Sequence, residues 1–266
     1  MVKIAITGIS GRMGRTIATC VEDEEGAILA GALEKEEHPW VGRGLQELTG
    51  LNTSVVVTDN PEEAFRDADV VIDFTTPEAT IRNLEIAVAL QKPVVIGTTG
   101  FSVEQRATIT EASRRVGVVF APNMSIGVNL LFRLVTEAAR ILGDEYDVEI
   151  VEYHHRHKKD APSGTALRIA ELIAHTLGRD LDKVAVYGRK GITGERTTEE
   201  IGIQSVRAGD IVGDHIVLFA GSGERLELTH RAHSRTTFAR GAVKAALWLV
   251  DRDTGLYDMQ DVLGLR

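Results

Sequence analysis

Cysteine is almost absent from this sequence. Cys20 is the single one among 266 residues, so the chain can form no internal disulfide. Its fold therefore does not require an oxidising compartment. No Cys and His residues recur at the spacings typical of a metal site, and we expect no bound metal.

Long apolar runs are also missing. The stretch MVKIAITGISG leads directly into a strand-like pattern, without the apolar segment of a signal peptide. No apolar run approaches the length of about 18 residues that a membrane-spanning helix needs. We therefore expect a soluble, cytoplasmic protein that does not associate with membranes.

Positive charge is in deficit. The chain has 30 Lys and Arg against 39 Asp and Glu, which gives a formal net charge of −9. A chain this acidic is a poor candidate for binding nucleic acid or an anionic membrane, and we expect neither partner. The hydrophobic fraction of 43% is ordinary for a globular protein, and the length allows one large domain or two small ones.

Strand-like and helix-like segments alternate through the first half of the chain. The strand-like runs are 3–7, 27–34, 54–58, 69–74, 93–97 and 117–122. Helical spacing follows most of them, for example over 77–90 and 102–115. The run DVVIDF is apolar on consecutive positions, which is typical of a strand buried on both faces. This alternation predicts an α/β fold with a parallel sheet and right-handed crossovers.

The pattern changes near residue 125, where we expect a domain boundary. The expected elements are a helix over 127–142, a strand over 148–157, a helix over 165–177 and a last helix over 237–250. Three β-like runs, 201–207, 211–220 and 225–233, are joined by glycine-containing turns. Turns of this kind predict consecutive antiparallel hairpins.

A glycine-rich turn, G-I-S-G-R-M-G over residues 8–14, follows the first strand and opens the first helix. Glycines there permit a tight turn and let the backbone approach a pyrophosphate, while the helix N-terminus supplies N–H groups. Ser10 stands where the commonest fingerprint has its second glycine. The turn predicts a dinucleotide site, and a glycine turn that serves packing alone is the alternative.

An acidic residue ends the second strand. Glu34 follows Gly14 by 20 residues and is suited to accept hydrogen bonds from a ribose 2′-OH. Lys35 comes next and could face a 2′-phosphate, although a solvated lysine is the alternative. The pair predicts NAD binding with some tolerance of NADP. The segments 73–77, 97–100 and 121–124 are expected at the same carboxyl edge of the sheet.

The segment HHRHKKDAPSGTA, residues 154–166, begins with six basic side chains. Ser163 is a natural N-cap for the helix that follows, with Gly164 and Thr165 in its first turn. Cations beside a helix N-terminus form an anion site, so the segment predicts a pocket for a carboxylate or phosphate.

Crowding of these cations has a second consequence. Like charges disfavour the protonated forms, so we expect histidine and lysine pKa values in the segment to fall toward neutrality. Such a group can hold an anion and also give up a proton. A solvated basic loop is the alternative. Cys20 is expected in the core, and the remaining histidines are expected to be structural or solvated: His38, His175, His215, His230 and His233.

These residues resemble a known family. EYHHRHKKDAPSGTA is similar to the signature segment of the dihydrodipicolinate reductases, also called 4-hydroxy-tetrahydrodipicolinate reductases, of the diaminopimelate and lysine pathway. Other segments are similar to family segments in the same order, so the resemblance covers nearly the whole chain. They are GISGRMG, IDFTTPEAT, VIGTTGF, FAPNMSIGVN, VRAGDIVGDH, GERLELTH, TFARGAVKAALWL and GLYDMQDVL.

The resemblance implies a fold and an activity. The fold is a Rossmann-like dinucleotide-binding domain with a parallel sheet, here 1–125 with 236–266, and an inserted α+β domain with a mixed sheet, here 126–235. The inserted domain binds substrate and builds a homotetramer. The implied reaction uses NADH or NADPH, and no metal, to reduce the cyclic dicarboxylate 4-hydroxy-tetrahydrodipicolinate to tetrahydrodipicolinate with loss of water.

The resemblance also implies residue roles. His154 and Lys158 are the candidates for proton transfer, with Lys158 favoured as the donor. The substrate carboxylate is held by His155, Ser163, Gly164 and Thr165. The cofactor residues are Gly8, Ile9, Ser10, Gly11, Arg12, Met13, Glu34, Lys35, Gly97, Thr98, Thr99, Ala121, Pro122, Asn123 and Met124.

Three of the cofactor positions depart from the family pattern. Ser10 replaces a glycine and Pro122 replaces an alanine found in some members. Lys35 stands where the family often has arginine, and lysine lacks the bidentate fork that suits a phosphate, so the preference for NADP stays open.

Two other functions compete with this hypothesis. A different NAD(P)-dependent oxidoreductase, such as a relative of aspartate or homoserine dehydrogenase, shares the glycine turn but does not account for HHRHK followed by SGT. A non-enzymatic sensor of NAD requires the basic segment to be solvated.

Overall fold

The computed structural model describes residues 1–266 as two compact units. One unit contains Met1–Ile126 and Arg235–Arg266, and the other contains Gly127–Ser234. None of the helices is both long and apolar enough to span a bilayer.

The first unit is built on a seven-stranded sheet in which every pairing is parallel. Its strands, in spatial order, are β12 (Gly255–Tyr257), β6 (Gly117–Phe120), β5 (Val94–Ile96), β4 (Val70–Asp73), β1 (Val2–Thr7), β2 (Ala27–Leu33) and β3 (Val57–Thr58). The order reverses between β1 and β4, and the carboxyl ends of strands at such a switch point form the usual ligand crevice of open α/β sheets.

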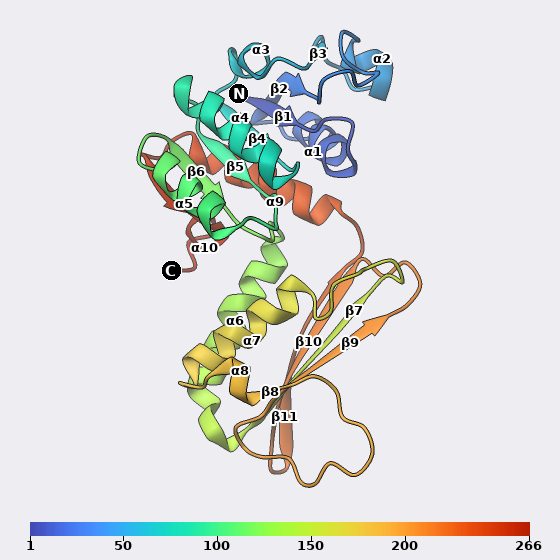
Figure 1. Ribbon diagram of the computed structural model, residues 1–266, viewed down its shortest axis with the longest axis vertical. Coiled ribbons are helices and arrows are strands. Elements are labelled where there is room, and N and C mark those ends of the chain that lie inside the picture. The colour runs from blue at the N-terminus through green and yellow to red at the C-terminus, as the bar shows by residue number, and fades with distance from the viewer. The chain divides into compact units, whose positions relative to one another are not determined.

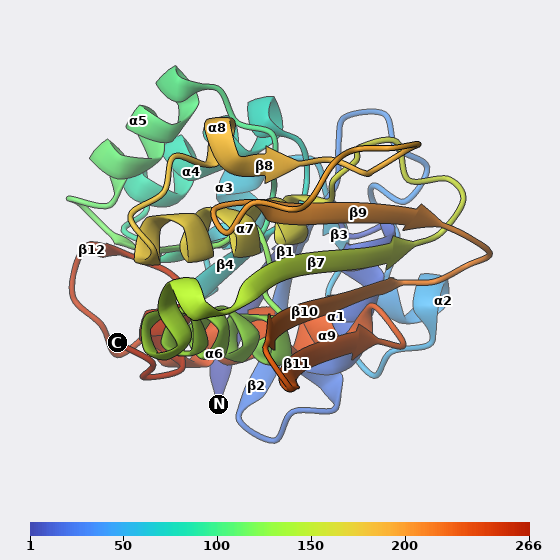
Figure 2. The same cartoon turned by 90° about the horizontal axis from the view of Figure 1, so that it is seen from below.

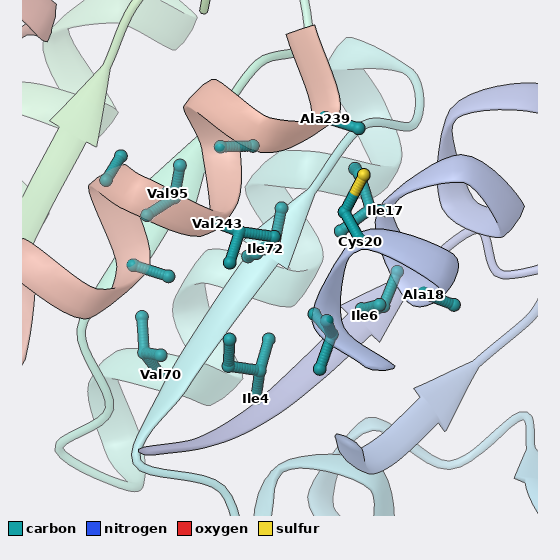
Figure 3. Close-up of a cluster of buried hydrophobic side chains, with 14 of the residues drawn as sticks. Ile4, Ile6, Ile17, Ala18, Cys20, Val70, Ile72, Val95, Ala239 and Val243 are labelled. Carbon is teal, nitrogen blue, oxygen red and sulfur yellow. The ribbon is translucent and has the colours of Figure 1, made fainter. Parts of the chain in front are cut away.

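Helices cover both faces of this sheet (Figure 1). They are α1 (Arg12–Glu22), α2 (Leu45–Thr49), α3 (Pro61–Phe65), α4 (Pro77–Ala89), α5 (Val103–Ala112), α9 (Thr236–Leu249) and α10 (Met259–Val262). Alternate strand residues point to opposite cores, as a strand buried on both faces requires. Ile4 and Ile72 pack toward α1 and α9, as Figure 3 shows, whereas Ala5 and Val71 pack toward α3, α4 and α5.

The predicted parallel sheet is confirmed. The strand expected over 54–58 is reduced to Val57–Thr58, and β12 and α10 lie in a stretch where the sequence pattern predicts no element. Cys20 is buried in the core beside α9, as expected.

The second unit has a mixed, five-stranded sheet, seen in Figure 2. Its strands, in spatial order, are β11 (Glu224–Ala232), β10 (Gly213–Gly221), β7 (Asp147–His154), β9 (Ile201–Arg207) and β8 (Ala185–Val186). Its helices are α6 (Ile126–Leu142), the 3-10 turn η1 (Gly143–Glu145), α7 (Gly164–Thr176) and α8 (Leu181–Val184). Helices α6 and α7 pack on one face, against Ile150 of β7 and Val217 of β10.

One predicted hairpin is wrong. β10 and β11 pair antiparallel across a tight turn, as expected, but β9 and β10 are not neighbours. β7 lies between them, paired antiparallel with β10 and parallel with β9. The glycine in the connection marks a turn, but it does not determine which strands pair. β7 also ends at His154, so the expected strand over 148–157 is three residues too long at this end.

Candidate active site

The glycine turn lies at the carboxyl end of β1, next to β4. Gly8 has a φ of +62°, and a Cβ added there would lie 3.0 Å from Thr75 Cγ2. A Cβ on Gly14 would lie 2.2 Å from the Gly8 carbonyl oxygen, so α1 starts directly against the turn. The N-cap of α1 is Gly11, and no side chain caps this helix. A cradle of bare backbone at an uncapped helix N-terminus fits the pyrophosphate of a dinucleotide.

Glu34 lies directly after β2 and reaches back to this turn. Its Oε2 accepts the Ser10 N–H at 3.0 Å and its Oε1 accepts the Lys35 N–H at 3.0 Å. Burial raises the pKa of Glu34, but the hydrogen bonds from Ser10 and Lys35 outweigh it and lower the pKa below its usual value. The carboxylate is therefore ionised and can accept from a ribose hydroxyl, while Lys35 is exposed beside it.

A buried carboxylate supports the next two loops at this edge. Asp73 ends β4 and accepts hydrogen bonds from the hydroxyls of Thr75, Thr80 and Thr98, at 2.7 to 3.1 Å. Gly97 lies flat against Phe74, since a Cβ there would be 2.1 Å from the ring. The Thr98 hydroxyl is therefore occupied in holding the loops together, which leaves its backbone to meet a ligand.

The other expected cofactor residues divide by exposure. Ile9, Ala121 and Met124 have buried side chains in the core, so they can reach a ligand only through their backbone. Gly11, Arg12, Thr99 and Pro122 are exposed, and Met13 and Asn123 are half-buried. The Asn123 side chain accepts the Ser125 N–H at 2.9 Å, which fixes the loop after β6.

In the second unit, His154 is the last residue of β7 and is oriented by a buried acid. Its Nδ1 lies 2.5 Å from Oε2 of Glu152, which is fully buried. Burial by itself raises the pKa of Glu152, but hydrogen bonds from His154, Arg207 and Ser205 outweigh it and hold the pKa well below its usual range. Because Glu152 is ionised, Nδ1 of His154 carries the proton and Nε2 is the nitrogen left for chemistry.

Lys158 is paired with an acid rather than crowded only by cations. Its Nζ lies 2.9 Å from Asp160 Oδ2, and its side chain is 20% exposed. Together with Glu152, Asp160 supplies negative charge within the basic segment. The crowded cations therefore have acidic partners close by in the sequence: Glu152 lies two residues before His154 on β7, and Asp160 lies two residues after Lys158.

The N-terminus of α7 follows the predicted pattern. Ser163 is its N-cap, with Oγ accepting the Ala166 N–H at 3.1 Å. The first turn contains no acidic residue. Gly164 begins the helix in open space, because a Cβ there would meet nothing within 4 Å. Thr165 and His155 are half-buried, and the His155 ring lies 6.3 Å from that of His157. This helix N-terminus can receive an anion.

His215 was expected to be structural or solvated, and sequence reasoning missed its place in the cluster. It is buried on β10, with Nε2 3.1 Å from Ser163 Oγ and its ring 5.4 Å from that of His154. Burial is the main cause that lowers its pKa to about 3; neighbouring His154, His230 and Lys158 act in the same direction, and Glu152 acts against them. His215 is therefore a neutral hydrogen-bonding partner of the α7 cap.

Glu152 and Arg207 were also missed. Glu152 precedes His154 by two residues on a strand, and this period of two could have placed both on one face. No comparable pattern in the sequence indicates the role of Arg207, because only the pairing of β9 with β7 brings it next to Glu152. No group of three or more His, Cys, Asp or Glu residues is positioned to hold a metal ion.

The parallel sheet, its glycine turn and the acid after the second strand define a nucleotide-dependent oxidoreductase of the Rossmann type. Two family models narrow this class: one described as dihydrodipicolinate reductase, N-terminus, matches residues 2–124, and one described as dihydrodipicolinate reductase, C-terminus, matches 127–263. The chain belongs to the dihydrodipicolinate reductase family.

Similar proteins agree with this assignment. The chain is 53% identical to a 4-hydroxy-tetrahydrodipicolinate reductase of Geotalea uraniireducens over 100% of both chains. It is 54% identical to one of Aromatoleum aromaticum, over 99% of this chain and 96% of the other. The competing hypothesis of an aspartate or homoserine dehydrogenase is set aside, because both family models are those of dihydrodipicolinate reductase.

Solved structures are similar as well. A dipicolinate-bound dihydrodipicolinate reductase from Paenisporosarcina sp. TG-14 superposes with a TM-score of 0.75 at 28% identity, covering 98% of both chains. A probable dehydrogenase from Thermotoga maritima gives a TM-score of 0.62 at 11% identity, over 98% of this chain and 92% of the other, and shares the fold alone.

Proposed function

We propose that this chain reduces 4-hydroxy-tetrahydrodipicolinate to tetrahydrodipicolinate, with loss of water, in the diaminopimelate and lysine pathway. Membership of the reductase family supports the reaction. One observation supports the assignment of this reaction to particular residues: His154 pairs with buried Glu152 beside the α7 N-terminus. That arrangement offers a proton donor and an anion site on neighbouring residues, as reduction of a cyclic dicarboxylate needs.

The two units take different parts in this reaction. We assign cofactor binding to Met1–Ile126 with Arg235–Arg266, and substrate binding to Gly127–Ser234. A bound nicotinamide supplies hydride to the substrate. The negative charge that then develops on the substrate is neutralised by a proton, and His154 and Lys158 are the groups that can give it.

Substrate carboxylate binds at the start of α7 in this proposal. Ser163 caps the helix, and Gly164 and Thr165 present backbone and a hydroxyl in its first turn. His155, half-buried in the turn after β7, adds an imidazole N–H that can donate a hydrogen bond to the carboxylate. Open space beside Gly164 supports close approach of a ligand to the backbone.

We propose that NADH is preferred and NADPH is tolerated. An ionised Glu34 accepts from the ribose 2′-OH and repels a 2′-phosphate. Exposed Lys35 offsets part of that repulsion, but it supplies a point charge rather than a bidentate fork.

The sheet face away from α6 and α7 supports a homotetramer. Apolar, half-buried side chains of three neighbouring strands share that face: Val151, Tyr153, Val206, Ile216 and Leu218. A sheet face of this composition needs a cover, and we propose that other copies of the chain supply it. We place the reaction in the cytoplasm, where the single thiol of Cys20 stays reduced.

A coupled assay tests the reaction. Pyruvate, aspartate semialdehyde and the upstream synthase generate the substrate, and oxidation of NADH and NADPH is followed with the purified protein. Oxidation that depends on the synthase is expected with both cofactors. The absence of oxidation with either cofactor would reject the proposal.

Variants in the same assay test the proton donors. Lys158→Ala is expected to lower kcat strongly with little change in the KM for NADH, and its matched control is Lys159→Ala, an exposed neighbour. If the combined variant His154→Ala, Lys158→Ala leaves kcat and KM unchanged, the segment is solvated and neither residue donates the proton. A sensor of NAD would instead bind the cofactor and show no oxidation in the coupled assay.

A further inference from the structure

Glu152 receives an unusual number of hydrogen bonds for a buried side chain. Besides the Ser205 side chain, four donors reach its two oxygens: His154 Nδ1 at 2.5 Å, both terminal nitrogens of Arg207 at 2.8 and 2.7 Å, and the Ser163 N–H at 3.1 Å. The carboxylate is fully buried. A charge in such a position is stable only while these donors stay in place, so Glu152 fixes their relative positions.

The sheet register places this carboxylate in the middle of the site. Glu152 of β7 lies opposite His215 of β10 on one side and Ser205 of β9 on the other. Below it on the same face the side chains are apolar, with Ile150 in the core. Glu152 therefore lies at the boundary between the apolar core of the second unit and the polar cluster around His154.

The bond to Glu152 leaves only one arrangement of the His154 ring. Nδ1 donates to the carboxylate, and the ring meets His215 edge-on. At the other end of the ring, a Cβ on Gly213 would lie 2.9 Å from Nε2, so the glycine provides the room that the imidazole occupies. The ring keeps 11% of its side-chain surface exposed.

Arg207 extends the same network to the second candidate proton donor. Besides its two bonds to Glu152, it donates to the Asp160 carbonyl oxygen at 2.7 Å. The carboxylate of Asp160 in turn holds Lys158. The Ser163 N–H adds the cap of α7 to the set. One buried ion pair thus connects His154, Lys158 and the helix N-terminus.

We propose that Glu152 and Arg207 are positioning residues for proton transfer. Glu152 holds the Nδ1–H of His154, so Nε2 is the nitrogen that gives up the proton when the ring is protonated and is left bare afterwards. Arg207 keeps Glu152 in place and anchors the turn that carries Lys158. This inference rests on the proposed function, because it assigns His154 and Lys158 to the reduction. Neither residue touches the reacting atoms.

Glu152→Gln tests the role of the carboxylate. The amide keeps the shape but cannot accept from every donor, so the neutral His154 ring loses its fixed tautomer. We expect kcat to fall by about ten- to hundredfold, as for other residues that orient a histidine. The KM for NADH is expected to change little. The matched control is Glu171→Gln, which removes an exposed acid of α7 that pairs only with Arg168, and it is expected to keep the wild-type kcat.

The pH profile separates positioning from general damage. The charged and titratable groups around His154 are Glu152, Arg207 and His215, with Lys158 and Asp160 beyond them. A carboxylate in contact with a proton donor favours its protonated form, and Glu152→Gln removes the carboxylate that touches the His154 ring. The limb of the kcat profile on which the donor loses its proton is therefore expected to move to lower pH in Glu152→Gln. A damaged fold would lower kcat at every pH without moving that limb.

Arg207→Lys provides a second variant if Glu152→Gln does not fold. It keeps the charge and loses the fork, and a smaller fall in kcat with the same direction of pH shift is expected. A folded Glu152→Gln, or a folded Arg207→Lys where the first is unfolded, that keeps the wild-type kcat and pH profile would overturn the proposal.

A measurement independent of activity distinguishes this proposal from the function. Long-range proton–nitrogen NMR spectra of histidine-labelled protein report the ring tautomer, with the His154 signals assigned from their loss in His154→Gln. A proton on Nδ1 is expected in the wild type and a mixture of tautomers in Glu152→Gln. A neutral wild-type ring with its proton on Nε2 would overturn the positioning role, even if the coupled assay succeeds. Conversely, a failed assay with the expected spectra would reject the function alone.

Discussion

At the scale of single residues, Gly164 is a position where an effect on substrate binding can be tested apart from an effect on folding. It occupies the first helical position of α7, and a Cβ there would meet no protein atom within 4 Å. Packing therefore does not explain why this position lacks a side chain. The proposed substrate site accounts for it, since a carboxylate bound there would need the space next to the backbone N–H.

Gly164→Ala is accordingly expected to bind substrate poorly while folding normally. Alanine favours a helix over glycine by up to about 1 kcal/mol, so the melting temperature should stay the same or rise. The KM for substrate should increase by about tenfold or more, which corresponds to about 1.4 kcal/mol. Steady-state kinetics and thermal melts of the same preparation check both parts. An unchanged KM for substrate would remove Gly164 from the site.

In the proposed cofactor preference, Glu34 is the residue that distinguishes NADH from NADPH. Glu34→Gln keeps the size of the side chain but loses the ionised acceptor, and a hydrogen bond to a charged group contributes about 1.5 to 3 kcal/mol. We expect the ratio of kcat/KM for NADH to that for NADPH to fall by about tenfold.

The control for this variant is Glu36→Gln, which changes an exposed acid two residues away. It should leave the cofactor ratio unaltered. An equal loss with both cofactors in Glu34→Gln would show that this side chain supports the loop rather than reads the 2′ position.

Local pattern explains which site residues the sequence could predict. Ser163 as N-cap and Gly164 in the first turn follow from neighbouring residues, and the structure has both. Glu152 could have been placed beside His154 from the period of two along β7, whereas His215 depends on which strands pair, which no local signal determines. The cluster also contains Asp160, which pairs with Lys158.

At the scale of elements, three strands align a row of titratable side chains. His230 of β11 lies opposite His215 of β10, which lies opposite Glu152 of β7. Burial lowers the pKa of His230, although Asp214 acts in the other direction. The Nδ1 of His215 is buried without a hydrogen-bond partner. In this row, His215 and His230 are therefore favoured in their neutral forms and Glu152 in its ionised form.

This row of side chains predicts that the free energy of unfolding of the second unit decreases at acidic pH. A histidine whose pKa in the fold is about 3, against 6.5 for the free side chain, binds its proton less readily when folded. Stability is therefore full above pH 6.5 and declines as the pH falls toward 3. The loss is at most about 1.4 kcal/mol per pH unit for this one group. Glu152 acts in the same direction at lower pH, because its pKa is also depressed.

His215→Gln removes the titrating group and retains an amide that can bond Ser163. Its free energy of unfolding should depend less on pH between 6.5 and 3 than that of the wild type, even if it is lower at neutral pH. Urea melts across that range measure the difference, with His175→Gln, at an exposed position of α7, as the control. Identical pH slopes in wild type and His215→Gln would contradict the role given to His215.

The misassigned hairpin also belongs to this scale. β9 and β10 are consecutive, and the glycine between them indicates a turn, yet β7 pairs with both. Strands that are close in the sequence tend to pair, which favours a β9–β10 hairpin. However, β7 presents buried apolar side chains to both strands, with Ile150 aligned to Val217 of β10 and to Ile203 of β9. The tertiary gain from burying β7 at the centre outweighs the local preference.

At the scale of the whole molecule, the proposed homotetramer uses the open face of the five-stranded sheet. Ile216 and Val151 are cross-strand partners near its centre. Ile216→Lys places a charge in the proposed contact, so size-exclusion chromatography with light scattering should show a smaller species than the tetramer proposed for the wild type. Val103→Lys changes an exposed apolar residue of the other unit and should leave the mass as it is. A wild-type mass for Ile216→Lys would exclude this face from the interface.

The sequence predicted the first unit more completely than the second. Its strands alternate with helices, so order along the chain implies a parallel sheet. The short α2 and β3 and the terminal β12 and α10 deviate from the prediction. The return of α9 to the core beside α1 is different, because it joins segments more than two hundred residues apart through packing of Ala239 and Ile17. That link followed from the family resemblance rather than from any local pattern.

The central claim is a reduction that takes hydride from the cofactor and a proton from this chain. The most direct measurement is the mass of the product formed by the purified protein from enzymatically generated substrate and NADH deuterated at the transferred position. Tetrahydrodipicolinate carrying a single deuterium is the expected result. Product without deuterium, or no product while the synthase is active, would contradict the account.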